Sequence, residues 1–152
     1  MPMPWTYRQA SREWQAFLAD AQDAIGTPTD HSTFTAVEGV LRAFRNRLAP
    51  QQAIDFAQLL PAVLRALFVA DWQLDRPHLP PGTRADWTAE AQSLRRNHNI
   101  APDTCVEGCA LALRKSVHYA DLQAVLSKLP PFAGEFWSVT SVDPATLGPR
   151  IV

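Results

Sequence analysis

The sequence has few of the features that mark membrane, secreted or nucleic-acid-binding proteins. Its 152 residues include only two cysteines, and its formal net charge of −1 gives no overall field that would attract nucleic acid or an anionic membrane. No apolar run approaches the roughly 20 residues that span a bilayer. The first five residues, MPMPW, lack the basic and then apolar pattern of a signal peptide. We therefore predict a cytoplasmic protein with no membrane or nucleic-acid partner.

Patterns that would indicate an enzyme or a metal site are equally scarce. Only six glycines are present, and none forms a loop that could hold a phosphate group. Cys105 and Cys109 are four residues apart in a predicted helix, a spacing that suits a helix interface better than a disulfide or a zinc site. No two of the four histidines share ligand spacing on one helix: His31, His78, His98 and His118. We predict no catalytic residues, no metal and no cofactor.

The most informative feature that is present is a repeated segment. Residues 35–39 read Thr-Ala-Val-Glu-Gly, and residues 104–108 read Thr-Cys-Val-Glu-Gly, 69 positions later. An alanine follows each glycine four positions on. The same offset relates Leu60-Pro61 to Leu129-Pro130. Two separate matches at one offset predict an internal duplication.

Apolar residues recur at helical spacing along most of the chain, and no strand-like alternation competes with them. Thr6 to Gln9 has the spacing of a capping box, and Gly26 is a natural helix stop. The helix that contains the first motif is apolar over a wide arc and should be central. The sequence predicts an all-α fold with helices at about 7–25, 33–48, 50–60, 61–72, 86–96, 102–117, 120–129 and 131–137.

We predict a single domain over residues 1–152, a bundle of about six to eight helices built from two tandem pseudo-symmetric repeats. Repeat one covers about residues 7–72 and repeat two about 85–137. The proline-rich connector between them spans 73–84. The tail at 138–152 should lie extended over the surface or be partly disordered.

The repeated carboxylates Glu38 and Glu107 are the first candidates for chemistry. A duplicated acid can form a metal site, or a pair in which one pKa is raised. Helical di-metal sites add a histidine three residues after a glutamate, and neither glutamate has one. Arginines follow at helical spacing (Arg42 and Arg45 after Glu38, Arg114 after Glu107), so ion pairs are the favoured interpretation.

The repeated glycines Gly39 and Gly108 stand in the middle of predicted helices, where glycine costs about 1 kcal/mol relative to alanine. A Gly-x-x-x-Ala pattern lets two helix backbones approach closely. We predict that the two motif helices, 33–48 and 102–117, cross each other near these glycines. The alternative is that the glycines clear space for a ligand.

The order of the predicted helices also carries a resemblance. The first motif helix ends in Arg45-Asn46-Arg47-Leu48, and it is followed by a short helix ending in Leu-Pro and an apolar helix ending in Trp. Residues 58–65, QLLPAVLR, and a weaker second copy in Lys128-Leu129-Pro130 with Phe136-Trp137 complete the pattern. This layout resembles the DUF2267 family over about residues 8–137. The resemblance implies a helical fold and a bacterial source, and it implies no substrate and no catalytic residues.

Three functional hypotheses remain. The leading one is a non-catalytic protein-interaction or self-associating domain, because core patterning is rich while polar constellations are sparse; the basic cluster at 42–47 allows an acidic protein partner. The alternative is a small-molecule-binding bundle with a cavity between the repeats, near the tryptophans and His98, although a helix cap is the simpler role for that histidine. The third is a carboxylate-based metal-dependent enzyme using Glu38 and Glu107.

Aromatic residues gather at the ends of the predicted helices and bear on the leading hypothesis. They would suit an interface, although burial within the monomer is the simpler interpretation. These residues are Trp5, Trp72, Phe132, Phe136 and Trp137.

Overall fold

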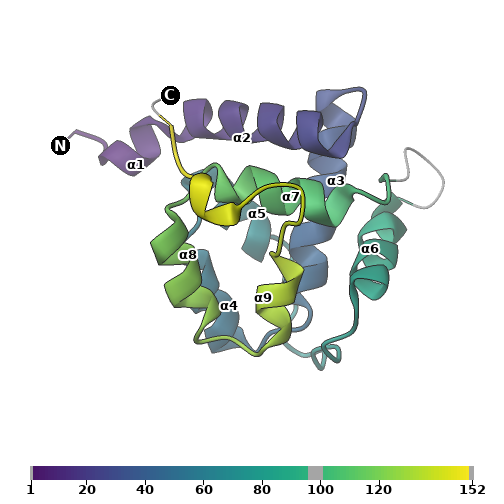
Figure 1. Cartoon of the computed structure of the whole chain (residues 1–152). Coiled ribbons are helices and arrows are strands. Elements are labelled where there is room, and N and C mark those ends of the chain that lie inside the picture. The colour runs from purple at the N-terminus through teal and green to yellow at the C-terminus, as the bar shows by residue number, and fades with distance from the viewer. Residues whose placement is uncertain (1, 96–100, 151–152) are drawn as a thin grey trace.

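The computed structural model describes residues 2–95 and 101–150, and these residues form helices and loops without a strand. The α-helices are α1 (Trp5–Arg8), α2 (Ala10–Ile25), α3 (Asp30–Arg45), α4 (Pro50–Ala57), α5 (Ala62–Val69), α6 (Arg84–Gln92), α7 (Cys105–Arg114), α8 (Tyr119–Leu126) and α9 (Phe132–Phe136). Short 3₁₀ helices cover Ser93–Arg95 and Pro144–Thr146. The predicted all-α, single-domain fold is confirmed (Figure 1).

Local sequence signals explain most helix ends. Gly26 ends α2 with a φ of +84°, a left-handed conformation that glycine adopts without strain. Thr29 is the N-cap of α3. Its side chain accepts a hydrogen bond from the Ser32 backbone and forms a capping box with Ser32. The capping box predicted at Thr6 is wrong. The chain becomes helical at Trp5, so Thr6 lies inside the first turn and cannot cap it.

Prolines divide the middle of the chain as the sequence predicts. Pro50 is the first residue of α4, where its missing N–H costs nothing. Pro61 precedes a new helix, α5. That helix ends at Val69, three residues earlier than predicted, and Asp71 then takes a left-handed φ of +57°. Asp71 is the one non-glycine residue with positive φ in the described part of the chain.

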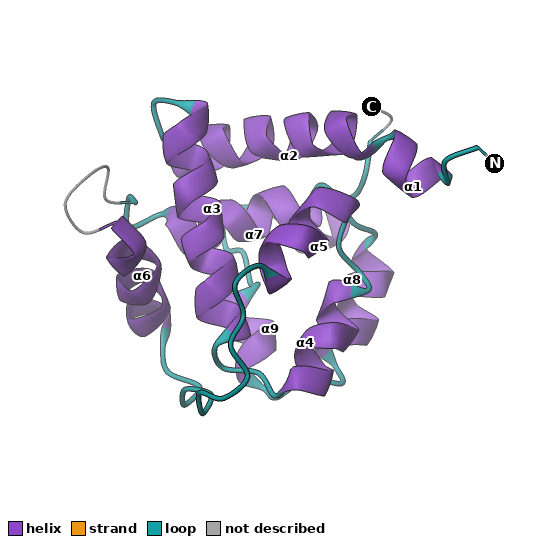
Figure 2. Ribbon diagram, turned by 180° about the vertical axis from the view of Figure 1, so that it is seen from behind, coloured by secondary structure: helices purple, strands orange, loops and turns teal. Residues whose placement is uncertain are grey.

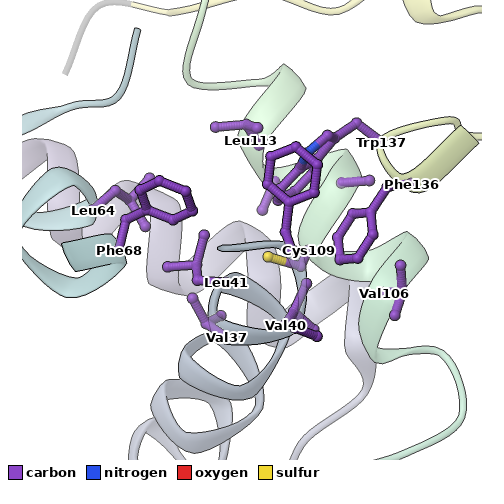
Figure 3. Close-up of a cluster of buried hydrophobic side chains, with 14 of the residues drawn as sticks. Val37, Val40, Leu41, Leu64, Phe68, Val106, Cys109, Leu113, Phe136 and Trp137 are labelled. Atoms are coloured by element: carbon purple, nitrogen blue, oxygen red, sulfur yellow. The ribbon is translucent and has the colours of Figure 1, made fainter. Parts of the chain in front are cut away.

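The centre of the molecule is α3, as its wide apolar arc predicts. It packs against α2, α5, α6 and α7. Figure 3 shows how side chains from several helices meet in one cluster. The labelled members are Val37, Val40 and Leu41 of α3, Leu64 and Phe68 of α5, Val106, Cys109 and Leu113 of α7, and Phe136 and Trp137 at the end of α9.

Aromatic rings fill the space between the two halves. The ring centroids of Phe44 and Phe56 are 4.8 Å apart, and Phe56 stacks on Trp137 at 5.5 Å. Phe132 and Phe136 are buried in the same cluster. Burial within the monomer is therefore the correct interpretation for three of the aromatics considered for an interface. Trp5 differs, because 66% of its surface is exposed.

The two halves exchange their first helices. The first long helix of the chain, α2, packs against α7 from the second half, and α6, which opens the second half, packs against α3 from the first (Figures 1 and 2). Each motif helix is therefore packed against a helix from the opposite half of the chain. The described contacts fit one interlocked unit and not two halves that merely touch.

The tail after α9 runs back over the surface of α7 and is fastened at three points. Arg84 donates hydrogen bonds to the carbonyl oxygen and the hydroxyl of Ser138 at 3.1 and 3.0 Å. Glu107 accepts two hydrogen bonds from Thr140. Arg150 forms an ion pair with Asp20 of α2, which brings the end of the described chain back to the N-terminal helices (Figure 1).

Candidate functional site

Each of the repeated glycines lies against another helix, but the two motif helices do not meet at these glycines. A Cβ atom at Gly39 would lie 2.5 Å from the carbonyl oxygen of Ala91 in α6. A Cβ at Gly108 would lie 2.5 Å from Cγ1 and 2.9 Å from the backbone nitrogen of Ile25 in α2. The predicted role in close helix packing is confirmed, and the predicted crossing of the two motif helices at the glycines is wrong. The error arose because a shared motif suggested a shared contact, whereas each copy binds the first helix of the opposite half.

A wide concave surface lies beside the first motif. We call it the arginine groove; it has a volume of about 780 Å³ and is bounded by α3, the end of α5, the connector and the end of α6. Figure 2 shows the connector running from α5 across α3 to α6. Its lining residues include Arg42, Arg45, Asp71, Trp72, Leu74, Arg76, His78, Leu79, Glu90 and Leu94.

Arg45 lies at the bottom of the groove and binds carbonyl oxygens at the C-terminal end of α5. Only 5% of its surface is exposed, and Nη1 donates hydrogen bonds to the carbonyl oxygens of Phe68 at 3.1 Å and Ala70 at 2.7 Å. Those carbonyls lack partners at a helix C-terminus, where a cation is favourable. The guanidinium also lies 5.8 Å from the centre of the Trp72 ring. Burial lowers the pKa of Arg45, and the nearby positive charge of Arg42 lowers it further.

Arg42 connects two carboxylates. Its Nη2 lies 3.3 Å from an oxygen of Asp71 and 4.0 Å from an oxygen of Glu38. The predicted pairing of Glu38 with Arg42 is therefore present, while Arg45 binds carbonyl groups instead. The side chain of Asp71 is 84% exposed, so Arg42 Nη2 holds a carboxylate that water also reaches. Arg42 Nε is buried and has no hydrogen-bond partner among the described residues.

The far wall of the groove is held by a second ion pair. Glu90 of α6 accepts hydrogen bonds from Arg47 and from Asn46, each at 2.8 Å. The connector is fixed to the same place, because the Leu79 backbone donates to the Asn46 carbonyl at 2.7 Å. Glu90 is therefore fully engaged. Arg76 has no ion pair or hydrogen bond among the described residues, so it is the arginine of this groove with its charge uncommitted.

In the second half, Glu107 binds backbone and not arginine. Its Oε1 accepts a hydrogen bond from the Thr140 backbone at 2.7 Å and from the Thr140 hydroxyl at 2.9 Å. These hydrogen bonds hold the pKa of Glu107 below its ordinary range. The predicted ion pair with Arg114 is wrong, because Arg114 is buried and its Nε donates to the Trp137 carbonyl at 2.8 Å.

Two of the three buried arginines follow the same offset as the motif, and the third is Arg47. Arg45 and Arg114 are 69 residues apart, and so are their acceptors, Phe68 and Trp137. Buried positions of the motif helices recur likewise: Ala36, Val37, Val40, Leu41, Ala43 and Phe44 in α3, and Cys105, Val106, Cys109, Ala110, Ala112 and Leu113 in α7. Sequence reasoning noted both arginines without pairing them; their common offset was the signal. The division into two repeats stays a prediction.

The cysteines lie where the sequence places them, in a helix interface. Both are buried and free. Burial raises the pKa of the Cys105 thiol to about 11, and it raises the pKa of Cys109 as well. A thiol that stays protonated is a poor nucleophile. Neither cysteine is therefore suited to covalent catalysis.

Other surfaces offer less chemistry. A groove of about 470 Å³ lies between α1, α2, the α4–α5 turn and Arg150, and a smaller one of about 360 Å³ lies beside Arg114 and Tyr119. Across residues 2–95 and 101–150, no three His, Cys, Asp or Glu side chains come together as metal ligands would. No helix in those ranges is long and apolar enough to cross a membrane. His98 lies outside the described residues.

Comparison with known proteins finds one family over most of the chain. The family described as "Uncharacterized conserved protein (DUF2267)" matches residues 14–136, which is more than three quarters of the 152 residues and includes every helix from α3 to α9. No curated protein matches the chain. The resemblance seen in the sequence is confirmed: the chain belongs to the DUF2267 family.

Proposed function

We propose that this protein is a non-catalytic binding domain that holds a segment of a partner protein in the arginine groove. The observation that carries the proposal is the combination of an open groove with side chains that the fold leaves uncommitted. Arg76 has no ionic partner among the described residues, and Leu74 leaves 63% of its surface exposed. Arginine and aromatic side chains are enriched at protein interfaces, and Arg76 and Trp72 line this groove together with Leu74.

Other features support a binding role over a catalytic one. Glu38 and Glu107, the candidates for carboxylate chemistry, are engaged by Arg42 and by Thr140 respectively. The buried free thiols of Cys105 and Cys109 fit a reducing compartment, and we propose that the protein acts in the cytoplasm. Self-association is the case in which the partner is a second copy. Light scattering over a range of protein concentrations distinguishes that case from a different partner.

A small anionic molecule is the second candidate ligand. The volume of about 780 Å³ lies within the range of small-molecule sites, and Trp72 provides an aromatic wall beside Arg45. A thermal shift with a panel of small anions, absent after Arg76→Ala, would favour this candidate. A set of peptides that binds while no small anion does would favour the protein partner.

The proposal is tested by selecting peptides from a random displayed library against the full chain. We expect a common sequence to be enriched, and we expect its binding to weaken at least tenfold in Leu74→Ala and in Arg76→Ala. Both side chains are exposed, so these variants should keep the melting temperature of the wild type. The matched control is Val142→Ala, an exposed apolar side chain on the tail, which is 44% exposed.

Two results would contradict the proposal. One is a selection that enriches no common sequence after repeated rounds. The other is an enriched peptide that binds the Leu74→Ala, Arg76→Ala and Val142→Ala proteins with equal affinity, which would place the interface elsewhere on the molecule.

A further inference from the structure

One difference between the two halves lies next to the motif glutamate. At the offset of 69 residues, Glu38 corresponds to Glu107 and Asp71 to Thr140. In the second half, the glutamate accepts a hydrogen bond from the backbone of Thr140 and so holds the segment that follows α9. In the first half, Arg42 stands between Glu38 and Asp71, and the corresponding position in the second half is Leu111.

The arrangement in the first half is not needed to complete the fold. Arg45 already closes α5, as Arg114 closes α9. Asp71 adds a contact to Arg42 at 3.3 Å, but its backbone takes a φ of +57°, which carries strain for a residue with a side chain. A strained, exposed carboxylate held by one arginine atom contributes little to stability. The second half shows that the same place can be closed without it.

We propose that Arg42 is a binding residue for a carboxylate of the partner, and that Asp71 occupies its place in the free protein. The ligand group is an aspartate or glutamate side chain, or a C-terminal carboxylate. It accepts hydrogen bonds from Arg42 while Asp71 turns out to solvent. The aromatic ring of Trp72 and the charge of Arg76 lie along the same groove and can contact the neighbouring part of the segment.

A carboxylate fits this position better than a phosphate group. Asp71 is itself a carboxylate, so the geometry that Arg42 presents already accepts that group. A doubly charged phosphate would also face Glu38, whose oxygen is 4.0 Å from Arg42 Nη2, and Glu90 across the groove. Arginine forms two parallel hydrogen bonds with a planar carboxylate, and Arg42 now uses only Nη2 on Asp71.

This inference rests on the proposed groove, but it is tested with a probe that needs no selected peptide. The probe is N-acetyl-glutamate methylamide, compared with N-acetyl-glutamine methylamide, which has the same shape without the charge. Backbone amide resonances of residues 71–76 are followed by NMR during each titration. We expect the glutamate probe to shift these resonances at least threefold more strongly than the glutamine probe.

Two variants identify the residues responsible. Asp71→Asn removes the competing charge while keeping a residue that tolerates positive φ, and it should tighten the glutamate probe about two- to fivefold. Arg42→Gln should abolish the difference between the two probes. Arg42 is partly exposed and Asp71 is exposed, so both variants should fold. Circular dichroism and the melting temperature are the check on folding.

The outcomes separate the two proposals. Equal shifts with both probes in wild type and Asp71→Asn overturn the carboxylate site, and so do larger shifts with inorganic phosphate than with the glutamate probe. A selected peptide that depends on Leu74 but carries no carboxylate overturns this inference and leaves the proposed function intact. If the glutamate probe shifts the resonances more than the glutamine probe but the selection enriches no peptide, the carboxylate site stands and the proposed protein partner is contradicted.

Discussion

Gly39 and Gly108 leave no room for a side chain. Each lies in the middle of a helix, and each faces the backbone of a helix from the other half, Ala91 for Gly39 and Ile25 for Gly108. A side chain at Gly39 would meet only backbone atoms of Ala91, and one at Gly108 would meet the Ile25 side chain at 2.5 Å and its backbone nitrogen at 2.9 Å. The loss of helix propensity at glycine, about 1 kcal/mol, is therefore offset by close packing.

We expect Gly39→Ala to lower the free energy of unfolding by about 1–3 kcal/mol, although alanine favours helix. The reason is the added methyl group, which would lie 2.5 Å from the Ala91 carbonyl oxygen. The matched control is Gly134→Ala in α9, where nothing lies within 4 Å and stability should not fall. Urea denaturation measures both. A Gly39→Ala protein as stable as wild type would mean that α6 does not pack on this face of α3.

The residue scale also shows what sequence could and could not predict. The offset of 69 predicted that Gly39 and Gly108 serve the same purpose, and they do. It could not identify their partners, because Ala91 and Ile25 are ordinary helix residues that become contacts only through the path of the connector. Glu107 was assigned to Arg114 by helical spacing, whereas the tail supplies Thr140 from beyond the last helix.

At the scale of elements, two buried arginines bind carbonyl oxygens at the C-terminal ends of two helices. Arg45 binds the last carbonyls of α5, and Arg114 binds the carbonyl of Trp137 after α9. Both helices are short, with eight and five residues, and short helices depend on tertiary contacts. The arginines therefore fix the closing segment of each half against its motif helix.

We expect Arg114→Met to lower the free energy of unfolding by about 1–3 kcal/mol, because a buried carbonyl loses its hydrogen bond while the packing volume is largely kept. The comparison is Lys115→Met, the adjacent cation, whose side chain makes no hydrogen bond or ion pair to a described residue, while its backbone donates to Leu111. Chemical denaturation of both variants measures the difference. Equal stability of the two would show that Arg114 does not hold the end of α9.

The tail is an element whose attachment should depend on pH. Hydrogen bonds from Thr140 hold the pKa of Glu107 below its ordinary value of 4.5, so the folded state is stabilised by the charged carboxylate above that value. This stabilisation is lost as the pH falls through the lower pKa of the folded state.

We therefore expect Glu107→Ala to be less stable than wild type by about 1 kcal/mol at pH 7, with the difference disappearing as the pH falls well below 4.5. Urea denaturation at neutral and acidic pH measures both. Glu135→Ala is the control, because only the backbone of Glu135 accepts hydrogen bonds. A difference that stays constant with pH would contradict a role for the charge.

At the scale of the whole molecule, the exchange of α2 and α6 makes one unit of the two halves. Helix positions, the central place of α3 and the family were predictable from periodicity, prolines and motif order. The exchange was not, because periodicity shows that a face is apolar but not which helix covers it. The arginine groove was equally hidden. It forms where the connector, the end of α5 and α6 meet, and these segments are distant in sequence.

The exchange also explains where binding should occur. The aromatic core is buried and the motif faces are covered by helices, so a partner has to bind at a surface groove such as the one beside the connector. The connector passes over α3 and carries Leu74 and Arg76 into the groove. The two halves resemble each other in their core contacts and differ at Arg42 and Asp71, which places the distinguishing chemistry on the same surface.

Amide hydrogen exchange of the full chain, with and without a peptide selected against it, tests this surface most directly. Binding in the arginine groove predicts slower exchange across residues 71–79 and little change across 58–61 and 115–116, which line the groove of about 470 Å³ near the termini. Protection of that second groove with no change at the connector would contradict the assignment.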